Sequence, residues 1–240
     1  IFLSGGADPY IISRSLRFNS GDSAYLNRTP SSAGNRKTWT WSAWVKRSGI
    51  GANDNLFKVA GSGNKDTQFS IMIHNGNYVS IDYGGAFYLK STRLLRDPSA
   101  WQHWVVSVDT TNSTANNRIR LYINGVEETA FDTRNNPNQN EDLGINRASE
   151  HTISSNDSSG LDGYLADVYF IDGQALAPTD FGETDGDNVW QPKKFAGSYT
   201  LPASGSGIVY SSLVSGPTSG SPYNIERAFD GDLTTFGDHS

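Results

Sequence analysis

The stretch TWTWSAWVK, residues 38–46, decides the fold. In a strand, successive side chains point to opposite faces of the sheet. One face here therefore carries Trp39, Trp41, Ala43 and Val45, and the other carries Thr40, Ser42 and Trp44. Because an aromatic side chain buries about 150–250 Å², we expect Trp39 and Trp41 in the core of an all-β domain. The alternative function for these rings is a stacking platform for sugars, and Trp44, on the opposite face, is the better candidate for it.

A second alternating run predicts a hairpin. Ile119, Leu121 and Ile123 share one face, and the turn-forming pair Asn124-Gly125 follows directly. A two-residue Asn-Gly turn between alternating runs is typical of antiparallel strands. Similar runs recur from residue 15 to residue 171. The last of them, residues 161–171, is apolar on both faces and therefore predicts a central strand with Val168 in the core.

The composition supports this class and excludes others. The 240 residues include 25 Gly, 11 Tyr, 11 Phe and 6 Trp, and only 18% are charged. Gly and aromatic residues suit short strands joined by turns. The net charge of −6 and the scattered Lys and Arg argue against a nucleic-acid partner. No run approaches the ~20 apolar residues of a membrane span, so we expect no membrane insertion.

The chain contains no cysteine, which excludes disulfides, thiol catalysis and cysteine metal sites. It also mildly favours folding in a reducing cytoplasm. The first three residues, Ile-Phe-Leu, are too short for the core of a secretion signal.

Shifts in composition divide the chain into four segments. Residues 1–14 form an arm, and residues 15–182 form the main β domain. Residues 183–222 are rich in Gly, Ser and Pro and predict a linker. Residues 223–240 look like the incomplete start of a second β module. The arm and the C-terminal segments hold apolar residues without a core of their own, so we expect them to pack on other subunits.

The order of several motifs resembles the laminin G-like, concanavalin A-type jelly roll. The motifs are Ser15-Leu16-Arg17-Phe18, Ala43-Trp44-Val45-Lys46, Trp101-Gln102-His103-Trp104, Leu121-Tyr122-Ile123-Asn124-Gly125 and Gly163-Tyr164-Leu165-Ala166-Asp167-Val168. The resemblance implies a two-sheet antiparallel sandwich over residues 15–182. It implies little about function, because this fold serves many unrelated tasks.

Three longer phrases resemble a subgroup of this family found in tail-associated and other structural proteins of marine phages. They are SLRFNSGDSAYLNRT, GNRKTWTWSAWVKRS and DVYFIDGQALAPTDFGE. This resemblance implies a protein of the virion exterior. It leaves open whether the chain belongs to a tail fibre, another tail-associated part or a capsid decoration.

The end of the chain resembles the start of a discoidin-type module. The run from Asn224 to Gly231, with Thr234 and Thr235, matches that family's Ala-Phe-Asp-Gly pattern, and Phe236 departs from it. In such a module Asp230 and Asp232 are candidate ligands of a structural calcium ion. The competing interpretation is ordinary Asp-Gly turn chemistry, and no other cofactor is expected.

The sequence predicts no enzyme. A glycosidase needs two carboxyl groups held about 5–9.5 Å apart, but the predicted strands carry almost no acids. Glu127 and Glu128 are adjacent and point to opposite faces. The four histidines are not spaced as metal ligands, and we expect His103 to be a packed histidine rather than a catalytic base.

We therefore expect a non-enzymatic virion structural protein that assembles with copies of itself, a trimer being favoured, and with other virion proteins. Host surface glycans are the candidate ligands, and Trp44, Tyr83 and Tyr88 are the aromatic candidates for stacking on them. The alternative is a secreted, extracellular bacterial carbohydrate-binding module.

Overall fold

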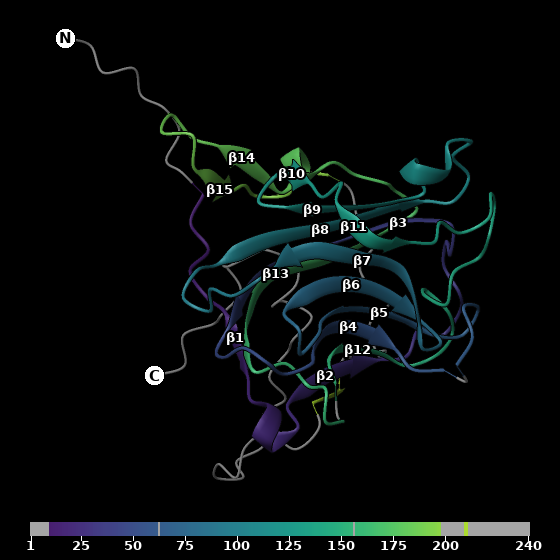
Figure 1. Ribbon diagram of the computed structural model, residues 1–240, viewed down its shortest axis with the longest axis horizontal. Coiled ribbons are helices and arrows are strands. Elements are labelled where there is room, and N and C mark those ends of the chain that lie inside the picture. The colour runs from purple at the N-terminus through teal and green to yellow at the C-terminus, as the bar shows by residue number, and fades with distance from the viewer. Residues whose placement is uncertain (1–9, 62, 156, 198–208, 211–240) are drawn as a thin grey trace, which may run out of the picture.

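The computed structural model describes residues 10–61, 63–155, 157–197 and 209–210. It is a sandwich of two large antiparallel sheets, a jelly-roll arrangement that confirms the expected fold class (Figure 1). The described residues hold three 3₁₀ turns and no α-helix, namely η1 (Ser20–Asp22), η2 (Ala115–Asn117) and η3 (Pro178–Asp180). They contain no helix with the length and hydrophobicity of a transmembrane span.

The six-stranded sheet has the order β1-β13-β3-β8-β9-β10. These strands are β1 (Leu16–Phe18), β13 (Gly163–Asp172), β3 (Thr38–Arg47), β8 (Gln102–Asp109), β9 (Ile119–Ile123) and β10 (Val126–Glu127). The motif strands β3 and β13 lie side by side, and Trp41 pairs with Val106 of β8 and with Phe170 of β13.

The eight-stranded sheet has the order β11-β7-β6-β5-β4-β12-β2-β16, and several of its strands appear as nested arcs in Figure 1. These strands are β11 (Phe131–Arg134), β7 (Ala86–Leu94), β6 (Tyr78–Tyr83), β5 (Phe69–Ile73), β4 (Asp54–Val59), β12 (His151–Ser154), β2 (Tyr25–Arg28) and β16 (Val209–Tyr210). A small hairpin, β14 (Gly182–Thr184) and β15 (Trp190–Pro192), forms a third sheet.

The core lies between the two large sheets and confirms most of the predicted core residues. Trp39, Trp41, Ile119, Leu121 and Ile123 are buried in one continuous apolar cluster. Val168 differs, because it is only partly buried and packs against the edge of that cluster. The β9–β10 turn is also confirmed. Both Asn124 (φ 50°) and its neighbour Gly125 (φ 78°) adopt the left-handed conformation of a type I′ turn.

A β-bulge in β13 explains the position of Val168. Ala166 pairs with Trp44 and Tyr169 pairs with Ser42, so three steps along β13 oppose two along β3. Asp167 takes the left-handed conformation, with φ 45°. Its carboxylate accepts a hydrogen bond of 2.9 Å from the hydroxyl of Tyr10, which ties the described end of the N-terminal arm to the sheet.

A buried ion pair joins the two sheets. Arg47, at the end of β3, donates from Nε to Asp54 Oδ2 of β4 at 2.8 Å. The side chains are only 5% and 3% exposed. Arg47 Nη1 also donates to Asn77 Oδ1 at 2.9 Å and to the carbonyl of Leu95 at 3.2 Å. One guanidinium therefore fixes β3, β4 and the β5–β6 turn relative to one another.

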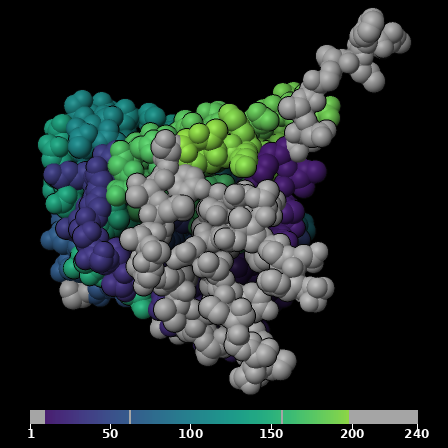
Figure 2. Space-filling view, turned by 180° about the vertical axis from the view of Figure 1, so that it is seen from behind, coloured from purple at the N-terminus to yellow at the C-terminus, as the bar shows by residue number. Residues whose placement is uncertain are grey.

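The linker expected from residue 183 onward is wrong for its first part. Two residues of that part, Trp190 and Phe195, pack on the outer face of the six-stranded sheet instead. Phe181 and Phe195 stack with ring centroids 4.9 Å apart and cover Val105, Tyr169 and Ile171. Figure 2 shows this segment in green to yellow-green along one edge of the back of the molecule. The apolar residues within the Gly-rich stretch supply the contacts that a composition argument overlooks.

A pair of truncations tests this packing. Ending the chain after Gly197 retains Trp190 and Phe195 and serves as the reference, since both truncated forms lack β16 and its pairing with β2. Ending it after Gly182 removes the buried Phe195 and the half-buried Trp190. The domain should lose at least the ~1.5–3 kcal/mol that burying one large apolar side chain contributes. Chemical denaturation of both forms measures the difference. Equal stability of the two truncated chains would show that the segment contributes nothing.

Candidate functional site

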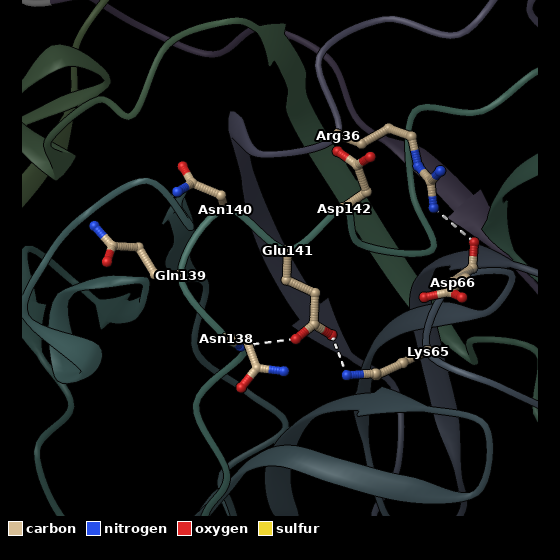
Figure 3. A pocket seen from close by; sticks show the side chains of 8 residues that line it. All are labelled: Arg36, Lys65, Asp66, Asn138, Gln139, Asn140, Glu141 and Asp142. Carbon is tan, nitrogen blue, oxygen red and sulfur yellow. Dashed lines mark hydrogen bonds and ion pairs between the residues drawn. The ribbon is translucent and has the colours of Figure 1, made fainter.

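Three loops at one end of the sandwich surround an open hollow of about 420 Å³, which we call the rim hollow. The loop before β3 contributes Arg36, the β4–β5 loop contributes Lys65 and Asp66, and the β11–β12 loop contributes residues 138–142. Figure 3 shows Arg36, Lys65 and Asp66 on one side and the loop from Asn138 to Asp142 facing them. The lining contains five charged side chains and three amides, so the hollow is suited to a polar ligand.

Two of these side chains hold the loops in place. Glu141, whose side chain is 9% exposed, lies 2.7 Å from Lys65 Nζ and accepts a hydrogen bond of 2.7 Å from the backbone N–H of Asn138. Pairing with Glu141 raises the pKa of Lys65. Arg36 donates from Nε to the carbonyl of Leu143 at 2.8 Å and from Nη2 to the carbonyl of Asp66 at 2.7 Å. Glu141 and Arg36 therefore hold the loops together through these contacts.

Other lining groups remain available. In the part of the chain that the structure describes, no hydrogen bond engages the side-chain amides of Asn138 and Asn140 or the carboxylate of Asp66. Among the described residues, the carboxylate of Asp142 forms one ion pair, with Lys37 at 3.9 Å. Asn140 adopts the left-handed conformation, with φ 62°, which Asn tolerates better than most residues. The hollow therefore presents amide donors and acceptors together with two carboxylates to solvent.

The three aromatic residues predicted to stack on a sugar, Trp44, Tyr83 and Tyr88, do not present the exposed ring faces that stacking requires. Tyr88 is 2% exposed in the core, and burial, followed by the charge of Glu141, raises the pKa of its phenol far above the usual range. Tyr83 is half-buried, with its ring centroid 4.2 Å from that of Tyr88. Trp44 is 9% exposed and stacks on His103. Trp44 and Tyr88 are therefore buried. The prediction that they stack on a ligand is wrong, because His103 covers Trp44 and Tyr83 packs against Tyr88.

The calcium candidates Asp230 and Asp232 lie outside the described residues. Within the described ranges, no group of three or more His, Asp or Glu side chains converges as a metal site would require.

His103 is packed, as the sequence predicts. It is 1% exposed, and burial lowers its pKa to about 4. Its Nε2 lies 2.9 Å from Ser42 Oγ, and its Nδ1 accepts a hydrogen bond of 3.1 Å from Trp190 Nε1. Both ring nitrogens are therefore engaged, and neither faces a solvent-filled cleft.

The architecture and the rim hollow define an all-β sandwich domain with a polar loop-end site. Residues 19–180 match the Laminin_G_3 family model, described as the concanavalin A-like lectin/glucanases superfamily, so the chain belongs to that family. No curated protein sequence matches the chain.

Several solved structures are similar to it. A heptameric SAP-like pentraxin from Limulus polyphemus shares 14% identity, with 64% of this chain and 71% of that chain covered and a TM-score of 0.44. The CBM40 domain of a Ruminococcus gnavus IT-sialidase, bound to α2,3-sialyllactose, shares 13% identity over 64% and 86% of the two chains, with a TM-score of 0.41. The NanB sialidase of Streptococcus pneumoniae shares 15% identity over 71% of this chain and 28% of that one, with a TM-score of 0.45.

Proposed function

We propose that this domain is a non-enzymatic glycan-binding module and that the rim hollow holds the sugar. The observation that carries the proposal is the set of groups without a hydrogen bond on Asn138, Asn140 and Asp66, together with the carboxylate of Asp142, which has only a long ion pair with Lys37 among the described residues. Sugar hydroxyls both donate and accept hydrogen bonds, so they match a site that mixes amides and carboxylates. Membership of a family whose description includes lectins supports the same conclusion.

The charges of the hollow favour a neutral sugar. Its two cations, Arg36 and Lys65, are committed to backbone carbonyls and to Glu141. The carboxylates of Asp66 and Asp142 are the charges left facing a ligand. Because like charges repel, an acidic sugar such as a sialic acid should bind more weakly than a neutral one.

Binding to a glycan array and to immobilised neutral polysaccharides tests the proposal. We expect Asn138→Ala and Asp142→Ala each to weaken binding of a neutral glycan about tenfold, which corresponds to the ~1.4 kcal/mol of one or two lost hydrogen bonds. Asp132→Ala is the matched control, since that exposed carboxylate lies on β11 outside the hollow and pairs with Lys90. Unchanged binding by both variants would exclude the hollow, and stronger binding of sialylated glycans would overturn the charge argument.

We further propose that the module sits on the exterior of a phage particle, in several copies and beside other virion proteins, with a trimer favoured. The support is the resemblance of residues 15–29, 34–48 and 167–183 to phage structural proteins. A secreted bacterial module with the same site would be found in culture medium and not in particles. Mass analysis of purified virions separates the two settings. Release of reducing sugar from a bound polysaccharide would contradict the non-enzymatic part of the proposal.

A further inference from the structure

Trp190 occupies a close-fitting seat on the outer face of the six-stranded sheet. Its ring stacks on that of His103, with centroids 6.0 Å apart and planes 20° apart. Two glycines border it. A Cβ atom on Gly125 or on Gly182 would come within 2.5 Å of the indole. The absence of side chains at these two positions is what allows the ring of Trp190 to reach His103.

The hydrogen bond within this seat fixes the state of His103. An indole N–H can only donate, so Nδ1 of His103, 3.1 Å from Trp190 Nε1, must be the acceptor and carries no proton. The neutral ring therefore holds its proton on Nε2, which donates to Ser42 Oγ at 2.9 Å. Trp190 is thus bonded to the one nitrogen that acid would protonate.

Among the described residues, no charged group contacts the ring of His103 while Trp190 is seated. Burial alone lowers the pKa of His103, to about 4. Its contacts are uncharged and come from β3, η3–β14 and β15, namely Ser42, Trp44, Phe181 and Trp190. On β9, Tyr122 bonds to Arg120, which in turn faces Glu127. On the hairpin, Asp185 accepts from Gln191 and Lys193 donates to the carbonyl of Thr179, while Glu183 is exposed.

Protonation at Nδ1 would set two N–H donors against each other. The stack with Trp44, 5.1 Å away, would persist, and an indole face attracts a cation. His103 can therefore accept a proton while the sandwich stays folded, provided that Trp190 leaves.

We propose that the β14–β15 hairpin is an acid-released latch, in which Trp190 docks the hairpin and the segment as far as Phe195 onto the outer face of the six-stranded sheet only while His103 is neutral. The pH dependence of docking follows from the lowered pKa of His103 in the docked state. The docked state disfavours the proton, so docking is complete above the ordinary histidine value of 6.5 and weakens as the pH falls toward about 4. The latch does not depend on what the rim hollow binds.

The indole N–H resonance of Trp190, assigned by its loss in Trp190→Phe, reports on docking in the full-length chain. Between neutral pH and about pH 4 we expect this resonance to move to a solvent-exposed position, in step with the titration of the His103 ring. Hydrogen exchange of this indole N–H, corrected for the intrinsic rate at each pH, should become roughly tenfold faster or more, because its hydrogen bond to His103 is lost. The indole resonances of Trp39, Trp41 and Trp104 should stay dispersed, which would show that the core remains folded.

A matched pair of glycine variants tests the seat without acid. Gly182→Ala places a methyl group against the indole and should give the released signal already at neutral pH. Gly186→Ala, in the same hairpin with nothing within 4 Å of the added atom, should behave as the wild type. The proposal is overturned if the Trp190 signal stays unchanged while His103 titrates, if it changes only when the core unfolds, or if Gly182→Ala retains the docked signal.

Discussion

Replacing Trp41 by alanine should lower the free energy of unfolding by about 3–5 kcal/mol, the cost of deleting a large side chain from a closed core. Trp41 is 0% exposed, and its ring packs against Phe57 of the opposite sheet at a centroid distance of 6.4 Å. The substitution therefore opens a cavity between the sheets. Urea unfolding of the two proteins measures the loss, and a loss below ~1 kcal/mol would be incompatible with this packing.

Trp41→Phe distinguishes the ring from its polar atom. The indole N–H of Trp41 finds no acceptor among the described residues. A buried donor without a partner destabilises the folded state. Phenylalanine keeps an aromatic ring and removes that donor. The free energy of unfolding should therefore fall by only a small fraction of the loss caused by Trp41→Ala. A phenylalanine variant as unstable as the alanine variant would show that shape alone governs this position.

Removing Asp54 should have an effect of comparable size. Asp54→Ala leaves the guanidinium of Arg47 buried and without its carboxylate, which costs about 3–5 kcal/mol in pairs of this kind. Burial raises the pKa of Asp54 and outweighs the opposing effect of Arg47. The raised pKa fits a pair that need not stabilise the fold more than an apolar pair would, while breaking the pair is costly because one charge stays buried without a partner. Chemical denaturation at neutral pH gives the value.

Two controls belong with Asp54→Ala. Asp132→Ala removes one partner of an exposed ion pair with Lys90 and should change stability far less, since water screens that pair. The double replacement Arg47→Met with Asp54→Leu removes both charges and should recover much of the loss. If the double variant were less stable than Asp54→Ala, the buried charge would not be the cause.

The sequence predicted the framework because its periodicity reports directly on burial. The alternation in residues 119–123 and the Asn124-Gly125 turn were confirmed. The strand predicted over residues 161–171 is β13, Gly163–Asp172, and it lies in the interior of the sheet between β1 and β3. The burial of Val168 was predicted less accurately. A run that is apolar on both faces indicates an interior strand but does not show where an extra residue shifts a side chain, as the bulge in β13 does here. Local patterns thus determine strands well and irregularities within them poorly.

The exposure of single aromatic rings could not be predicted in this way. The alternation correctly placed Trp44 on the outer face of β3, but His103 of the neighbouring strand β8 stacks on its ring. Phe181 and Phe195 cover another part of the same outer face, around Val105, Tyr169 and Ile171. The Gly, Ser and Pro content of residues 183–222 predicts a linker, whereas Phe181 falls within the predicted β domain. When a segment packs on strands far away in the sequence, its residues show no periodic pattern. Trp190 and Phe195 contact His103 and Val105 of β8 in this way, and in the sequence they stand as isolated apolar residues.

Only one part of the rim hollow, the loop of residues 138–142, shows a sequence feature typical of a functional site. Its residues 138–142 belong to a long polar stretch, a kind of loop that is often functional. No local pattern shows that Arg36 and Lys65 meet that stretch, because the three loops come together only through the order of the strands.

The bulge in β13 has a consequence for how this chain can change in length. Along most of β13, losing one residue would turn every following side chain to the wrong side of the sheet. At Asp167-Val168, however, the strand already holds one residue more than its neighbour β3. A deletion there would restore an even ladder and keep Tyr169 and Phe170 facing the sides they face now, at the cost of the Tyr10 contact if Asp167 is the residue lost. Homologues that differ in length within this strand should therefore carry the insertion or deletion at these two positions.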